Sequence, residues 1–124
     1  MDTRRKILSF AAALQLPRPL TVVTGYFNLL LPAHVRDLRE AREQTPGRPL
    51  LAVVVSGAAA LLEQRARAEL VAALRVVDYV VTADDGDLDR IAAAFLPSQL
   101  VRLEAADEHR TRQLKDHVRR RQNP

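Results

Sequence analysis

The sequence predicts an α/β domain in which a parallel sheet of four or five strands carries helices on both faces. The chain has 124 residues, enough for one substantial core and too few for a second domain, so we treat 1–124 as a single domain. Apolar residues make up 48% of it and charged residues 27%, as in ordinary globular proteins. Short β-branched runs alternate with helical patterns, an order that gives parallel strands joined by right-handed crossovers.

The first element is expected to be a helix over residues 3–16. Its apolar residues repeat at helical spacing: Ile7, Phe10, Ala11 and Leu14. Basic residues precede this run, as in an export signal, but Pro17 and Pro19 make a poor cleavage region. We therefore favour a docked helix over an export signal and expect a cytoplasmic protein. No stretch approaches the ~20 apolar residues of a membrane span, so no membrane partner is expected.

Four strands are expected further along the chain. They are placed at Leu20–Thr24, Leu50–Val55, Asp78–Ala83 and Gln99–Leu103. The second run, L-L-A-V-V-V, is apolar at every position, which is typical of a strand buried on both faces.

Four further helices are expected between and after these strands. They run from Pro32 to the turn at Thr45–Pro49, over Ala58–Arg75, from the turn at Asp84–Asp87 to about Phe95, and over Asp107–Arg121. The acidic segment D-D-G-D-L-D resembles part of a calcium loop but lacks the 12-residue spacing and the closing glutamate. We therefore expect a turn and a helix cap there, and no metal site.

Most of the net charge of +4 lies in the last helix. Residues 107–124 hold six lysines and arginines against three acids. Such a helix could contact nucleic acid, but it has no aromatic residue for base stacking, and Leu114 and Val118 give it a docking stripe. We favour a solvated helix without a nucleic-acid partner. The chain has no cysteine, which excludes disulfides and thiolate metal sites.

The best candidate for a ligand site lies between the first strand and the next helix. Gly25 allows a tight turn after the strand, and Pro32 suits a first helical turn, where its missing N–H group costs nothing. Free amides and the helix dipole then point at one spot. His34 stands in that first turn. We predict an anion-binding corner here; the simpler alternative is that His34 only caps the helix.

The segment T-G-Y-F-N-L-L-L-P-A-H-V resembles the opening motif T-x-G-x-F-D-x-L-H-x-G-H of the cytidylyltransferase-like nucleotidyltransferases. Within that superfamily it is most similar to heptose-phosphate adenylyltransferases and glycerol-3-phosphate cytidylyltransferases. Five positions match the motif: Thr24, Gly25, Phe27, Leu30 and His34. Three positions differ, with Asn28 for Asp, Leu31 for the first His and Ala33 for Gly. The resemblance covers about residues 21–101.

The resemblance implies a three-layer, Rossmann-like nucleotidyltransferase fold with the first strand inside the sheet. It also implies which residues would bind the nucleotide or phosphate: Thr24, Gly25, Tyr26, Phe27, Asn28, His34, Ser56 and Arg67. His34 would be the catalytic residue of an active member. Without the resemblance, Asn28 is typical of a turn residue and Arg67 of a solvated helix residue.

Members of this superfamily move a nucleotidyl group from a nucleoside triphosphate to a phosphorylated small molecule, usually with Mg²⁺, and release pyrophosphate. Donors that stabilise charge on the phosphate oxygens carry the catalysis, and removing one typically costs ~2.7–4 kcal/mol of barrier. Leu31 can donate no hydrogen bond, and the family's basic loop between Ser56 and Arg67 is missing. These losses weaken the catalytic interpretation.

Two functions remain open. The first is a protein that binds a nucleotide or phosphorylated small molecule with lost or impaired catalysis, and the substitutions favour it. The second is an active, divergent nucleotidyltransferase acting on a sugar or polyol phosphate, which would use Mg²⁺ with its nucleoside triphosphate. No other cofactor is expected. Because family members are commonly dimers, we expect a homodimer.

Overall fold

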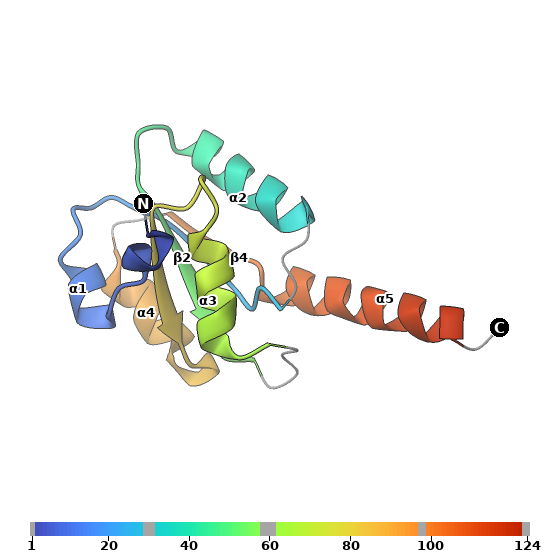
Figure 1. Cartoon of the computed structure of the whole chain (residues 1–124). Helices are drawn as coiled ribbons and strands as arrows, with labels where there is room; N and C mark the ends of the chain where they lie inside the picture. The colour runs from blue at the N-terminus through green and yellow to red at the C-terminus, as the bar shows by residue number, and fades with distance from the viewer. Residues whose placement is uncertain (1, 29–31, 58–61, 97–98, 123–124) are drawn as a thin grey trace.

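A four-stranded parallel sheet forms the centre of the molecule (Figure 1). The structure is a computed structural model that describes residues 2–28, 32–57, 62–96 and 99–122. Within these residues the strands are β1 (Thr21–Gly25), β2 (Leu50–Val55), β3 (Tyr79–Ala83) and β4 (Gln99–Arg102). They pair in parallel in the order β3-β2-β1-β4. The predicted parallel sheet is confirmed, and β1 lies inside it.

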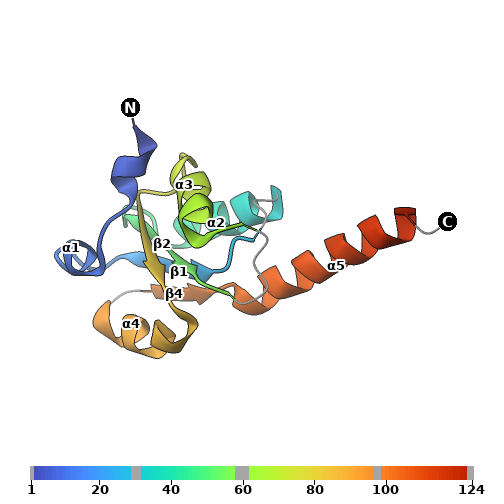
Figure 2. The same cartoon turned by 60° about the horizontal axis from the view of Figure 1, so that its bottom comes forward.

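Helices cover both faces of the sheet and make a three-layer α/β fold (Figure 2). One face carries η1 (Thr3–Lys6), α2 (Pro32–Gln44) and α3 (Gln64–Ala72). The other face carries α1 (Phe10–Leu14) and α4 (Leu88–Ala94), which follows the short 3-10 turn η2 (Asp85–Asp87). The last helix, α5 (Glu104–Gln122), leaves the sheet edge after β4 and projects away from the body. The predicted α/β class is confirmed.

The side chains of β2 show how the two faces are filled. They alternate between the two hydrophobic clusters, Leu50, Ala52 and Val54 towards α2 and α3, and Leu51, Val53 and Val55 towards α1 and α4. All six are 0% exposed. Burial on both faces explains why this strand needs an apolar residue at every position.

The N-terminal segment differs from the single helix expected over 3–16. It forms two short helices, η1 and α1, with an extended stretch between them. In that stretch Ile7 bridges to Val80, and the Leu8 amide donates to the Val80 carbonyl at 2.8 Å. Ser9 then caps α1, because its hydroxyl accepts a hydrogen bond from the Ala12 amide at 3.1 Å. The helix is interrupted because the chain pairs with the outer edge of β3 instead.

Two other helices also begin at residues different from those expected. The helix expected over Ala58–Arg75 is α3, and residues 58–61 of that expectation lie outside the described residues. The helix expected from Asp107 begins at Glu104, because the Asp107 amide already donates to the Leu103 carbonyl at 2.8 Å. None of the helices that the structure describes is long and apolar enough to span a bilayer.

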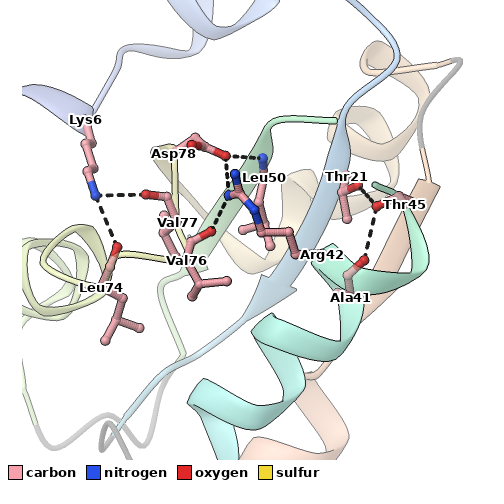
Figure 3. A network of polar contacts seen from close by, with 10 residues as sticks. All are labelled: Lys6, Thr21, Ala41, Arg42, Thr45, Leu50, Leu74, Val76, Val77 and Asp78. Atoms are coloured by element: carbon pink, nitrogen blue, oxygen red, sulfur yellow. Dashed lines mark hydrogen bonds and ion pairs between the residues drawn. The ribbon is translucent and has the colours of Figure 1, made fainter. Parts of the chain in front are cut away.

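Polar side chains tie α2 to the N-terminal edge of the sheet (Figure 3). Asp78 Oδ2 accepts one hydrogen bond from the Leu50 amide at 2.8 Å and another from Arg42 Nη1 at 2.7 Å. The hydroxyls of Thr21 and Thr45 are hydrogen-bonded to each other. The end of α2 is thereby fixed to the starts of three strands, while the start of α2 lies at the opposite edge, where a ligand site is expected.

Candidate functional site

The winding of the sheet reverses between β1 and β4. In such folds ligands bind beyond the carboxyl ends of the strands at this reversal. Here the Leu103 amide, just after β4, donates to the Thr24 carbonyl near the end of β1 at 2.8 Å. Because α5 starts at the next residue, its first turns are brought beside the loop that follows β1.

A buried carboxylate from α5 occupies the predicted anion-binding corner. Asp107 Oδ2 accepts hydrogen bonds from two consecutive loop amides, Tyr26 N at 2.8 Å and Phe27 N at 3.1 Å. Asp107 Oδ1 lies 2.5 Å from His34 Nε2. Asp107 is 1% exposed and His34 is 2% exposed. The loop amides and the imidazole therefore converge on one anionic group, as the sequence predicts for an anion site, but that group belongs to the chain itself.

The loop conformation creates this convergence. Phe27 has a φ of 50°, in the left-handed region, so the chain turns sharply directly after the two amides. Burial of the Phe27 side chain offsets the strain, because the ring is 1% exposed and packs 5.7 Å from the His34 ring, measured between centroids. An ideal Cβ on Gly25 would lie 2.7 Å from Asp107 Oδ2, so only glycine leaves room for the carboxylate.

Two other polar residues surround the corner. Asn28 Nδ2 donates to the hydroxyl of Thr111, one turn after Asp107, at 3.4 Å. Thr24 Oγ1 and Asn28 Oδ1 are buried and have no hydrogen-bond partner among the described residues. Asn28 thus contacts α5 rather than acting only as a turn residue.

Arg67 lies beside the corner and binds backbone carbonyls. It is 2% exposed, so it is not the solvated helix residue that its sequence context alone would indicate. Its guanidinium donates to four carbonyl oxygens, those of Tyr26, Val55, Ser56 and Leu62, at 2.5–3.1 Å. Burial lowers the pKa of Arg67 from its usual value. The guanidinium fastens the ends of β1 and β2 to α3.

Ser56 and Tyr26 border the corner on the β3 side. Ser56 Oγ accepts a hydrogen bond from the Asp85 amide at 3.3 Å. The Tyr26 ring packs on Gly57, where an added Cβ would lie 2.8 Å from it. Partial burial, together with the charge of Asp85 and of Glu108, raises the pKa of Tyr26 to about 12. The phenol therefore stays neutral at physiological pH.

The structure thus gathers the sequence-predicted residues into two linked groups. Gly25, Tyr26, Phe27 and His34 surround the Asp107 carboxylate, and Arg67 holds Ser56 beside them through shared carbonyl contacts. Leu30 and Leu31 lie outside the described residues. Sequence reasoning missed Asp107 and Thr111. Asp107 and Thr111 are four residues apart and therefore lie on one face of the last helix. Polar residues at two positions where a docked helix normally carries apolar ones were the signal that could have identified them.

The rest of the described surface offers a hollow but no cluster of metal-binding side chains. The described residues contain no group of three or more histidine, cysteine, aspartate or glutamate side chains that could hold a metal ion. A hollow of about 250 Å³ lies at the end of β3, and its lining includes Gln64, Asp84 and Arg90 but not Asp107. It contains none of the residues predicted from the motif.

Comparison with known proteins identifies a similar fold. No family model and no curated protein matches the chain. Among solved structures, the lipopolysaccharide core biosynthesis protein from Thermoplasma volcanium superposes with a TM-score of 0.52 at 20% sequence identity. The match covers 65% of this chain and 92% of that one. At this identity the likeness concerns the fold, so this chain shares the α/β architecture of that protein.

Proposed function

We propose that this protein has a nucleotidyltransferase-like fold that binds a nucleotide or another phosphate-bearing molecule at the corner after β1, with turnover lost or very slow. The observation that carries the proposal is the convergence of the Tyr26 amide, the Phe27 amide and His34 Nε2 on one carboxylate. A group of donors that holds one anion in a buried site has the geometry to hold another. The motif resemblance supports a phosphate as that anion, and the corner lies at the sheet reversal, where α/β folds of this kind bind ligands.

The same geometry argues against efficient catalysis. Nucleotidyl transfer builds negative charge on phosphate oxygens, and positioned donors or cations must stabilise it. Leu31, which stands where the resembling motif has its first His, can donate no hydrogen bond to those oxygens. Arg67, a cation that contacts the loop at the Tyr26 carbonyl, already donates to four carbonyls. Binding needs only the loop donors, whereas turnover needs free cationic groups as well.

A thermal-shift series tests the binding claim. Wild-type protein and His34→Ala are melted with ATP, CTP, inorganic pyrophosphate and glycerol 3-phosphate. A ligand at 100 times its Kd adds about 2.7 kcal/mol to stability, which corresponds to roughly 10 °C in Tm for a domain of this size. We expect at least one probe to raise the wild-type Tm and the variant to lose that shift. His109→Ala, at an exposed position on α5, is the matched control and should keep it.

Two results would overturn the binding claim: no probe changes the Tm, or His34→Ala keeps the full shift. Turnover is measured separately as pyrophosphate release from ATP or CTP with glycerol 3-phosphate and Mg²⁺. We expect rates far below the median enzyme value of ~10 per second. A rate near that value would reject the loss of turnover and identify an active nucleotidyltransferase.

A further inference from the structure

We propose that Asp107 is an internal competitor for the corner, so that binding of a phosphate group expels the Asp107 carboxylate and undocks α5. This inference rests on the proposed function, because it requires that the corner bind a phosphate. It adds that ligand binding and helix docking exclude each other.

The first support is that the carboxylate fills the position that an incoming anion would need. Asp107 accepts from both loop amides through Oδ2 and meets His34 through Oδ1, so one residue uses all three of these donors. It also occupies the space left by the missing side chain of Gly25. A phosphate oxygen cannot reach the same amides while Asp107 stays in place.

The second support is that α5 is attached mainly by polar contacts. Besides Asp107, the helix is held by Thr111 against Asn28 and by Arg110 Nη2, which lies 2.7 Å from Asp37 Oδ2. Among the described residues, neither hydrophobic cluster includes a residue of α5. Undocking therefore exposes little apolar surface, and an anion that replaces Asp107 removes the most deeply buried of these contacts.

The third support is that most of α5 stands clear of the domain. Figures 1 and 2 show the helix extending from the sheet edge with its C-terminal half away from every other element. Val118 is 46% exposed, so the predicted stripe of Leu114 and Val118 does not dock fully on the body. The helix can leave the corner without disturbing the core.

Competition has a measurable consequence for affinity. If Asp107 occupies the corner in about 90% of molecules, the apparent Kd of a phosphate ligand rises about tenfold. Removing the carboxylate should lower the apparent Kd by the same factor. Weakening the docking of α5 at another contact should lower it by less, because ligand binding and docking of α5 are linked equilibria.

The experiment is calorimetric titration of the full chain with inorganic pyrophosphate and with ATP. Asp107→Ala should bind at least about tenfold more tightly than wild type, because the corner is then free of the carboxylate in nearly every molecule. Arg110→Gln, which removes the docking contact with Asp37, should show a smaller gain. Asp116→Ala, an exposed acid on the same helix, is the matched control and should bind as wild type does.

Amide hydrogen exchange on the wild-type protein gives an independent measure. Saturating pyrophosphate should increase exchange over residues 104–111 of α5 while the Tyr26 and Phe27 amides stay protected, because phosphate oxygens replace the carboxylate. The exchange measurement on wild type and the affinity of Arg110→Gln together test the competition even if Asp107→Ala does not fold. Equal affinity of wild type and Asp107→Ala, or ligand-induced protection of 104–111, overturns the competition but leaves the binding function standing. If neither wild type nor Asp107→Ala binds a probe, the competition and the proposed binding function are both wrong.

Discussion

Asp107 Oδ2 lies 2.7 Å from the point where a Cβ on Gly25 would stand. The space between them therefore holds either this carboxylate or a side chain at residue 25, but not both. Gly25→Ala should therefore destabilise the domain by about 1–3 kcal/mol, the usual cost of overpacking a buried site. Denaturant unfolding measures this cost. Gly86→Ala, where an added Cβ has no neighbour within 4 Å, should change stability little.

The same clash predicts strong coupling between the two positions. In an Asp107→Ala background most of the Gly25→Ala penalty should disappear, which gives an interaction energy of about 0.5–3 kcal/mol in a double-mutant cycle. Additive effects would show that the carboxylate is not the group that Gly25 accommodates.

Arg67→Met should destabilise the protein by at least about 3 kcal/mol. The substitution keeps much of the side-chain volume but leaves four carbonyl oxygens without their donor, and each buried unsatisfied group costs ~1–3 kcal/mol. Arg65→Met, at an exposed position on the same helix, should change stability by less than about 0.5 kcal/mol. Similar unfolding midpoints for the two variants would contradict a structural role for Arg67.

The raised pKa of Tyr26 predicts a loss of stability at high pH. Its phenol titrates at about 12 in the folded protein against 10.0 for the unperturbed group, so the unfolded state loses this proton first. The stabilisation is complete below pH 10 and disappears as pH rises towards 12. Tyr26→Phe should flatten this part of the stability curve.

The tyrosinate absorbance of a Tyr79→Phe variant checks the pKa itself. The chain has two tyrosines, so this variant reports Tyr26 alone. Titration at pH 10 rather than near 12 would mean that the phenol is not held in the partly buried position beside Asp85.

We expect the protein to be a homodimer that uses the open side of β4. This strand ends the sheet order, and Leu96 and Leu100 beside it are 65% and 38% exposed. Multi-angle light scattering should give twice the chain mass of 13.8 kDa, and Leu100→Asp should shift it to the monomer. A monomeric wild type at high micromolar concentration would reject this expectation.

The sheet could be predicted from the sequence because local pattern determines it. The unbroken apolar run Leu50–Val55 has few alternatives to a strand buried on both faces, and all four strands lie within one residue of their expected bounds. The interruption between η1 and α1 could not be predicted in this way. It depends on Leu8 pairing with Val80, far away in the sequence.

The candidate site could be predicted only in part, for a similar reason. Gly25 and His34 are close in the sequence, so the corner follows from a local pattern of strand, turn and helix. The occupant of the corner comes from 73 residues after His34. In the sequence, Asp107 resembles an ordinary acid in the first turns of a helix, where the dipole favours it, and only the placement of α5 beside β1 reveals its partners.

Because α5 projects from the body, it can act as a long rigid arm that pivots at the corner. Asp107 lies in the first turns of a helix that continues to Gln122, which places the far end about 22 Å beyond the carboxylate at 1.5 Å per residue. A small rotation of α5 about Asp107 would therefore move its arginine-rich end through a much larger arc. A shift of α5 at Asp107 that is too small to disturb the sheet would therefore change the direction in which the most basic part of the molecule points.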